Sequence, residues 1–207
     1  MKVVTDVTRQ AKDSGRVNIF LDGAYGFSLS LDAVLQHKLA RGTTLTDEQV
    51  EKIRATHEEE IIYSKSLNFL SFRPRSRKEI EERIHRYAKD LSIETQQTIS
   101  SRVIHKLAKL DLIDDQKFAD WFVQNRKRHR PRSKLQILQE LLQKGVSKED
   151  ALRALEAASY SELEEIQKVI AKKLGRKSPK DLKTYLARKG FPFSLIEEAL
   201  RKLPKSA

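Results

Sequence analysis

The chain contains no cysteine, one methionine, one tryptophan, seven glycines and five prolines among its 207 residues. Without cysteine it can form no disulfide, no thiolate zinc site and no thiol nucleophile. No apolar run approaches the ~20 residues that a membrane-spanning helix requires. The first ten residues, MKVVTDVTRQ, lack the apolar core of a signal peptide. We therefore expect a cytoplasmic protein that makes no contact with membranes.

Motifs for catalysis and for metal or cofactor binding are also missing. The sequence has no HExxH motif and no P-loop, and its five histidines form no i,i+4 pair. The adjacent carboxylates Asp114 and Asp115 would not face each other on a helix, so a helix cap is a better interpretation than a metal site. We predict a protein that is not an enzyme and that uses no cofactor and no metal ion.

The chain carries a large and uneven excess of positive charge. The net charge is +12 and the pI is near 9.8. Residues 1–60 contain 8 basic and 10 acidic residues, whereas the rest of the chain contains 33 basic and 19 acidic residues. A basic field on one part of a soluble protein favours a polyanionic partner, either nucleic acid or an acidic protein surface.

The first thirty residues are the only part with the pattern of a β-sheet. In RVNIFLDGAYGFSLS, two runs of alternating apolar residues flank Asp22 and Gly23. Asp-Gly between two such runs is a strong signal for a hairpin, because the turn needs positive φ. KVVTDVT supplies a third strand. Three short strands are marginal alone, so we expect them to pack on the helices that follow.

Beyond residue 45 the apolar residues recur every three or four positions, which predicts helices. Seven capping boxes, each a hydroxyl residue followed three positions later by an acid or amide, indicate helix starts. They begin at Thr46, Ser76, Ser133, Ser147, Ser161, Ser178 and Ser194.

An internal repeat organises the helical part. RPRSKLQILQELLQKGVSKEDALRAL aligns without gaps with GRKSPKDLKTYLARKGFPFSLIEEAL, at an offset that pairs Ser133 with Ser178 and Gly145 with Gly190. FRPRSRKEI, which contains Ser76, fits the same template. Each unit is predicted to have a long helix, a capped basic helix and a closing helix, with the glycine ending the second helix in a left-handed conformation.

Basic residues gather around the capped start of the second helix in all three units. Because the first turn of a helix already presents free N–H groups and partial positive charge, added cations make it suited to an anion. We predict that the residues binding such a polyanion, either DNA or an acidic protein assembly, are Arg73, Arg75, Arg77, Lys78, Arg126, Lys127, Arg128, Arg130, Arg132, Lys134, Lys172, Lys173, Arg176 and Lys177. The alternative interpretation is a solubilising surface.

Several aromatic residues are predicted to be core. Phe118, Trp121 and Phe122 form the inner stripe of the helix capped by Asp114 or Asp115. Trp121 could instead stack on a base, but its place on an apolar stripe favours the core. For Phe69 and Phe72 we also favour core packing.

Three stretches resemble the RecX family of bacterial recombination regulators. They are LNFLSFRPRSRKEIEERI, LIDDQKFADWFVQNR and ELLQKGVSKEDALRAL, and the resemblance covers roughly residues 60–203. The earlier residues are similar to the partly β extension of some members. The resemblance is carried most securely by Arg73, Arg75, Ser76, Asp114, Asp115, Phe118, Ala119 and Gly145, none of which is catalytic in the family.

The resemblance implies a regulator that binds the RecA recombinase filament on single-stranded DNA. Such a protein would inhibit the ATPase, strand-exchange and co-protease activities of RecA, and so act in DNA repair and the SOS response. Double-stranded DNA is a further candidate partner. Two alternatives remain open, a general nucleic-acid-binding protein that acts on DNA or RNA directly and an adaptor for an unrelated acidic protein.

We predict a mainly α fold of tandem three-helix repeats in an elongated curved array, with a small N-terminal β-hairpin or three-stranded segment. The predicted segments are 1–45 (β segment with a short helix), 46–110 (first helical unit), 111–158 (second unit) and 159–207 (third unit). We expect a monomer.

Overall fold

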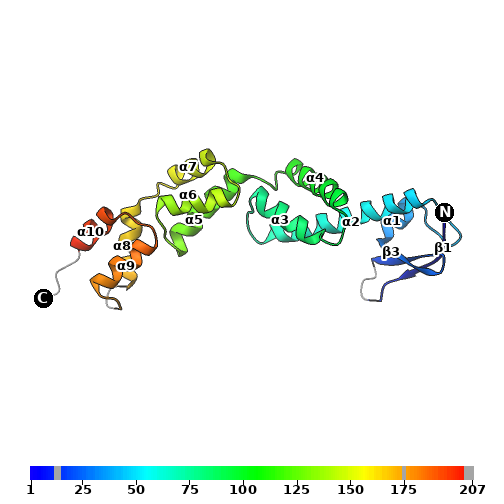
Figure 1. Cartoon of the computed structure of the whole chain (residues 1–207), viewed down its shortest axis with the longest axis horizontal. Helices are drawn as coiled ribbons and strands as arrows, with labels where there is room; N and C mark the ends of the chain where they lie inside the picture. Colours follow the sequence, from blue (N-terminus) through cyan, green and yellow to red (C-terminus); the bar gives the residue numbers. More distant parts are fainter. Residues whose placement is uncertain (12–14, 174–175, 203–207) are drawn as a thin grey trace. The chain divides into compact units, whose positions relative to one another are not determined.

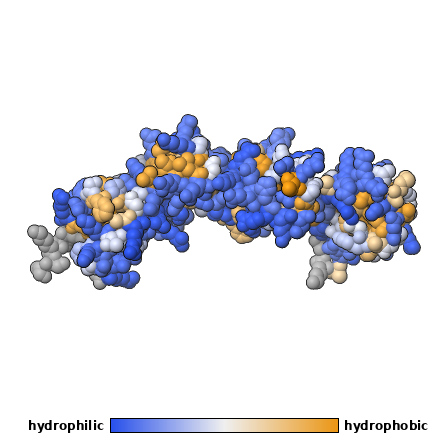
Figure 2. All heavy atoms as spheres, viewed as in Figure 1, coloured by the Kyte–Doolittle hydropathy of each residue, from blue (hydrophilic) through white to orange (hydrophobic). Residues whose placement is uncertain are grey.

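The computed structural model describes residues 1–11, 15–173 and 176–202. The chain divides into two compact units, Met1–Asn68 with Ile84–His105 and Phe69–Arg83 with Lys106–Ala207. The four-segment division remains a prediction, and its last five positions lie outside the described residues. Within the described ranges, every helix is too short or too polar to cross a membrane. Polar side chains cover most of the visible face of both units (Figure 2).

The first unit begins with a small antiparallel sheet. Its strands are β1 (Lys2–Arg9), β2 (Arg16–Leu21), β3 (Ala24–Ser30) and β4 (Thr44–Leu45), in the order β3-β2-β1-β4. Asp22 and Gly23 have φ of 51° and 84°, which confirms the predicted hairpin turn. The three predicted strands are confirmed, and β4 was missed because two residues carry no alternating pattern.

Helices follow the first three strands along the chain. They are α1 (Leu31–Gln36), α2 (Asp47–Ser71), α3 (Arg77–Tyr87) and α4 (Ile93–Lys109). Sheet residues such as Ile19 and Leu29 share one buried core with Val50 and Ile53 of α2. The predicted packing of the strands on the following helix is thereby confirmed. It gives a short sheet the apolar partner that it needs to be stable.

The second unit contains two sets of three helices, whose ribbons can be followed in Figure 1. One set is α5 (Asp115–His129), α6 (Lys134–Gln143) and α7 (Lys148–Ala157), and the other is α8 (Glu162–Lys173), α9 (Pro179–Arg188) and α10 (Phe193–Arg201). Each set has its own apolar core. Gly145 and Gly190 follow α6 and α9 with φ of 83° and 79°, so both end the second helix of their set as predicted.

Most of the predicted caps form. Thr46 and Gln49 make a reciprocal capping box, with Gln49 N–H donating to Thr46 Oγ1 at 3.1 Å and Thr46 N–H donating to Gln49 Oε1 at 2.8 Å. Asp114 caps α5 by accepting from the Lys117 N–H at 2.9 Å. The prediction for Ser194 was wrong, because α10 begins at Phe193 and its N-cap is Pro192, with no side-chain cap.

Of the aromatic residues predicted to lie in the core, most are buried or half-buried and one is exposed. Phe118 and Phe122 are buried, and Trp121 is half-buried against the core that they share. Phe69 is half-buried. Phe72 was wrongly predicted as core, because 75% of it is exposed.

We expect Ser133→Ala to lower the free energy of unfolding by about 1 kcal/mol. Ser133 Oγ accepts from the Gln136 N–H at 3.1 Å and is buried, so its loss leaves a first-turn donor without a partner. The matched control is Ser194→Ala, which removes an exposed serine with no capping role. Urea denaturation of both variants measures the difference, and equal midpoints would contradict a capping contribution from Ser133.

Candidate functional site

The first RPRS sequence forms a junction inside the second unit. Ser76 Oγ caps α3 by accepting from Glu79 N–H at 3.2 Å and donates to the Lys144 carbonyl at 2.7 Å. The next backbone group, Arg77 N–H, donates to the Asp115 carboxylate at 2.8 Å. The start of α3 is therefore held against the start of α5 and the turn after α6.

The second RPRS sequence makes the same kind of junction one repeat later. Ser133 N–H donates to the Lys189 carbonyl at 3.2 Å, after α9. Lys134 N–H donates to the Glu162 carboxylate at 2.8 Å, in the first turn of α8. In both copies, the residue after the capping serine donates its N–H to an acid that begins the next set of helices.

The chain therefore supplies its own anions to two of the predicted anion-binding helix starts. Asp115 occupies the N-terminus of α3 and Glu162 that of α6, where N–H groups and partial positive charge favour a carboxylate. Burial raises the pKa of Asp115, although the bond from Arg77 N–H opposes this effect. At these two positions the repeated motif holds the fold together, and the helix start already has an internal carboxylate in the place predicted for an external anion.

The first basic cluster, which consists of Arg73, Arg75, Arg77 and Lys78, makes contacts within the second unit. Arg73 makes two hydrogen bonds to the Glu79 carboxylate, at 2.9 and 3.1 Å, and lies 5.1 Å from the Trp121 ring centroid. Burial raises the pKa of Glu79, but hydrogen bonds from Arg73 and Lys144 outweigh it and hold the pKa below its ordinary value. The guanidinium of Arg75 lies 3.8 Å from the Phe69 ring centroid.

The other two cations of this cluster also have partners. Arg77 pairs with Glu81 at 2.9 Å, and Lys78 Nζ donates to the Gln143 carbonyl at 2.9 Å. Side chains committed in this way would have to break internal contacts before they could bind phosphate. The first cluster is thus mainly structural in this geometry.

The second basic cluster is Arg126, Lys127, Arg128, Arg130, Arg132 and Lys134, and the third is Lys172, Lys173, Arg176 and Lys177. Five of these ten cations line a different feature, a basic pocket of about 420 Å³ in the second unit. It is bounded by the end of α5, the following loop, α8 and α9. Seven lysine or arginine residues line it, and no acid does so in the described part of the chain. These cations are Lys127, Arg128, Arg130, Lys168, Lys172, Lys173 and Lys189.

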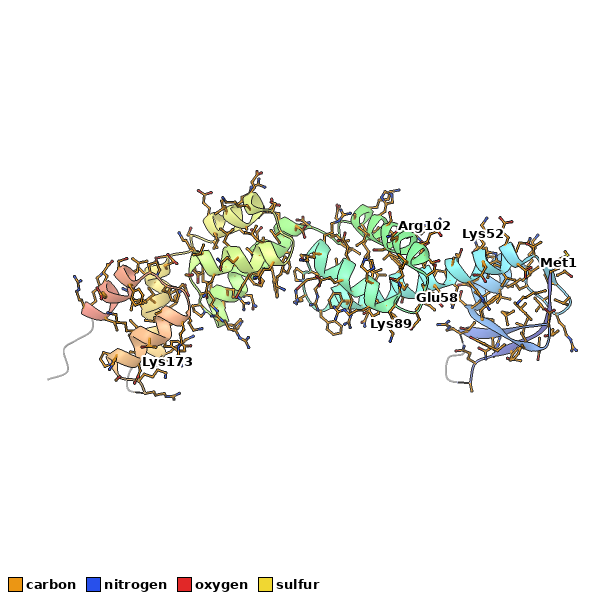
Figure 3. All side chains as sticks on the ribbon, viewed as in Figure 1. Met1, Lys52, Glu58, Lys89, Arg102 and Lys173 are labelled. Atoms are coloured by element: carbon orange, nitrogen blue, oxygen red, sulfur yellow. The ribbon has the colours of Figure 1, made fainter. Side chains whose placement is uncertain are left out.

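An aromatic ring lies within this basic pocket. Tyr185 of α9 has three ammonium groups near its ring centroid, Lys173 at 4.9 Å, Lys189 at 5.2 Å and Lys177 at 5.8 Å. The negative face of the ring partly offsets the repulsion among these cations. Lys173, labelled in Figure 3, lies at the end of α8. A basic groove with an aromatic surface is the combination that binds single-stranded nucleic acid.

Some cations of the second cluster have partners within the chain, whereas others are exposed. Arg126 pairs with Glu140 at 2.7 Å, Lys127 Nζ donates to the Ala158 carbonyl at 2.9 Å, and Arg132 donates to Gln136 Oε1 at 3.3 Å. Arg128 and Arg130 are exposed. Their side chains have no hydrogen-bonding or ionic partner within the described ranges.

In the third cluster, Lys172 is exposed and has no such partner among the residues described. Arg176 and Lys134 are also exposed but do not line the pocket. The uncommitted cations of the pocket are therefore those best placed to meet a polyanion.

A buried tyrosine positions the loop at the pocket. The Tyr160 hydroxyl donates to the Arg132 carbonyl at 2.7 Å and accepts from the Arg132 N–H at 3.3 Å. Burial raises the pKa of Tyr160 far above its ordinary value, so the hydroxyl stays protonated and can donate. The chain from Arg130 to Arg132 is thereby tied to the segment that leads into α8.

Sequence reasoning missed six lining residues of the pocket, which are His129, Pro131, Lys168, Val169, Tyr185 and Lys189. Tyr185 and Lys189 share a face of α9 with Leu182 and Leu186, at helical spacing. That spacing could have indicated a partly buried face that reaches the surface. The described residues contain no group of acids and histidines able to hold a metal ion.

Comparisons of the sequence with known proteins agree on one family. The family model described as the second three-helix domain of RecX matches residues 114–155, and the model of the N-terminal domain of regulatory protein RecX matches residues 2–46. The chain is 30% identical over 212 residues to regulatory protein RecX of Bacillus subtilis, covering 98% of this chain and 78% of that protein. It is 31% identical over 216 residues to regulatory protein RecX of Oceanobacillus iheyensis, covering 98% and 77%.

Solved structures show the same fold. A crystal structure of a regulatory protein RecX has a TM-score of 0.64 and 24% identity, and the match covers 98% of this chain and 100% of that chain. RecX from Lactobacillus salivarius has a TM-score of 0.53 and 25% identity, with 70% and 96% covered.

Proposed function

Because the chain belongs to the RecX family of regulatory proteins, we propose that it binds the RecA filament on single-stranded DNA and inhibits its ATPase, strand-exchange and co-protease activities. The partner comes from the family resemblance. This role is non-enzymatic, and it requires that the protein reach the cytoplasm, where recombination filaments form.

The observation that carries the proposal is the acid-free basic pocket. Cations from two sets of helices meet there. Three of them, Arg128, Arg130 and Lys172, are exposed and have no hydrogen-bonding or ionic partner among the described residues. A filament presents phosphates and acidic protein surface together, and both are ligands for lysine and arginine. Contacts to several protomers at once would raise the overall affinity without any single tight contact.

A second candidate function is direct binding to single-stranded nucleic acid without a recombinase. The observation that favours it is Tyr185, whose ring lies among lysines in the manner of a stacking surface. The two candidates differ in one measurable quantity, which is the ratio of affinity for filament to affinity for naked strand.

We expect sub-stoichiometric amounts of this protein to lower the rate of RecA ATP hydrolysis on single-stranded DNA. The rate should be titrated beside the affinity for the same strand with and without RecA. Inhibition with tighter binding to the filament supports the proposal. An unchanged hydrolysis rate beside tight binding to naked DNA contradicts it and favours the direct binder.

A further inference from the structure

The basic pocket of the second unit has the size of a small-molecule site. Its volume is about 420 Å³, and pockets that bind free small ligands measure roughly 300 to 1,000 Å³. A stable contact between two proteins is instead a broad surface, on the order of 800 Å² on each partner. The pocket is therefore large enough for a compact ligand that is separate from the filament.

Six of the seven cations that line the pocket have no carboxylate partner among the described residues. The seventh, Lys168, is paired with Glu165 at 2.6 Å. Lys127 donates to the Ala158 carbonyl, which is a neutral group, so its charge is not balanced. Like charges that are held close together repel each other, and an anion that contacts several of them at once removes this repulsion. The six are Lys127, Arg128, Arg130, Lys172, Lys173 and Lys189.

Contacts between the set α5–α7 and the set α8–α10 form the pocket before any ligand binds. The Tyr160 hydroxyl bonds to both backbone groups of Arg132, at 2.7 and 3.3 Å. Ser133 N–H donates to the Lys189 carbonyl at 3.2 Å, so the loop after α5 is attached to the end of α9. A ligand that enters a formed pocket loses less binding free energy to the ordering of loops.

The residue types at the pocket favour phosphate over carboxylate. Five of the seven cations are lysines. A lysine ammonium is a compact point charge that binds phosphate oxygens, whereas the planar fork of arginine matches a carboxylate in a bidentate manner. A chain of linked phosphates places several negative charges close together, so it can contact many of the unpaired cations at the same time.

We propose that the basic pocket binds the phosphate chain of a free ligand, either a nucleoside triphosphate or inorganic polyphosphate, and that this ligand excludes the RecA–DNA filament. Exclusion follows because Arg128, Arg130 and Lys172 cannot bind both anions at once. This exclusion rests on the proposed function, whereas binding of the phosphate chain does not. A nucleotide would add stacking of its base on Tyr185, whose ring centroid lies 4.9 Å from Lys173 Nζ.

The test is isothermal titration calorimetry of the full chain at constant ionic strength. The probes are tripolyphosphate, ATP, inorganic phosphate and citrate, which carries its charge on carboxylates. We expect one tripolyphosphate to bind per chain, about tenfold or more tighter than phosphate or citrate. Equal affinities for citrate and tripolyphosphate would overturn the phosphate ligand. Many weak sites in place of one would overturn the pocket as the site.

The two sources of the phosphate chain give different results in the same titration. Tighter binding of ATP than of tripolyphosphate, with the difference lost in Tyr185→Leu, assigns the pocket to a nucleotide. Equal binding of the two probes, unchanged in Tyr185→Leu, assigns it to inorganic polyphosphate.

A double variant, Arg130→Gln with Lys172→Gln, removes one unpaired cation from each set of helices. It should bind tripolyphosphate about tenfold or more weakly, through loss of two ionic contacts. The matched control is Lys109→Gln with Lys148→Gln, because both lysines are exposed in the second unit and neither lines the pocket. Equal losses in the two double variants would overturn the assignment to the pocket.

Competition with the filament tests the exclusion separately. Tripolyphosphate should release the protein from labelled filament at concentrations at which sodium chloride of equal ionic strength does not. The filament alone in the same tripolyphosphate shows that it stays assembled. Retention on the filament by a protein that binds tripolyphosphate in calorimetry would overturn the exclusion. A protein that binds tripolyphosphate but no filament would support the ligand site and contradict the proposed function.

Discussion

Replacing Arg128, Arg130 and Lys172 together with glutamine should weaken binding to the RecA–DNA filament roughly 100-fold at low salt. Each exposed ionic contact contributes on the order of 1 kcal/mol, and three such contacts correspond to roughly two orders of magnitude in affinity. If these side chains contact phosphates, the slope of log affinity against log salt should also become shallower by about 2. Fluorescence anisotropy of labelled filament over a series of salt concentrations measures both quantities.

The structure explains why these three residues are chosen and not the whole basic cluster. Arg126 and Lys127 bond to Glu140 and to the Ala158 carbonyl, so their loss would weaken the fold as well as binding. Arg128, Arg130 and Lys172 are exposed and have no such contact among the described residues. The triple variant should therefore melt within a few degrees of the unmodified protein, since surface substitutions away from specific contacts change stability little.

A control variant separates the pocket from the general positive charge. Arg41, Lys89 and Lys109 are exposed and do not line the pocket, and replacing them with glutamine removes the same charge. We expect this control to weaken filament binding by less than about threefold, through long-range electrostatics alone. Equal losses in the two variants would contradict the assignment of the pocket as the binding site.

Gly145→Ala should lower the free energy of unfolding by about 2–5 kcal/mol. A left-handed backbone costs a residue with Cβ on the order of 1–2 kcal/mol, and Gly145 has φ of 83°. The new Cβ would also lie 2.7 Å from Lys78 Cβ, at the junction where the start of α3 meets the turn after α6. Because a Cβ atom is attached directly to the backbone, α3 itself must shift, and overpacking of this kind costs about 1–3 kcal/mol more.

Alanine substitutions at two other glycines separate the two causes of this loss, which are the left-handed backbone and the close approach of the new Cβ. Gly42 has φ of 91° and open space around its missing Cβ, so Gly42→Ala should show the backbone cost alone. Gly190 has φ of 79° and faces the Gln136 side chain at 2.8 Å, and the outer part of that flexible side chain can move aside. Denaturant unfolding measures the decrease in unfolding free energy for each variant. The decrease should be largest for Gly145→Ala and smaller for Gly190→Ala, and for Gly42→Ala it should be no larger than for Gly190→Ala. A Gly42 loss as large as that of Gly145 would contradict the tight junction.

The sequence predicted turns and helix starts well where these are fixed by hydrogen bonds between residues within about four positions of each other. The Asp22-Gly23 turn and the caps at Thr46, Ser133 and Ser178 depend on neighbouring backbone groups, which the pattern of residue types reveals. The wrong prediction of a cap at Ser194 is also explained by a residue close in sequence. Pro192 has a fixed φ and begins the helix two residues earlier, so the serine pattern that follows caps nothing.

The sequence by itself determined the helical repeats, the hairpin, the excess of positive charge and the family resemblance. The tertiary structure decided which of the many cations are available. The RPRS sequence looks alike in both copies, yet Arg73 is paired with Glu79 whereas Arg130 is exposed at a pocket. Arg130 and Lys172 come together because Tyr160 and Glu162 dock one set of helices on the next. Docking of this kind depends on contacts between residues about thirty positions apart, which no local pattern of residue types encodes.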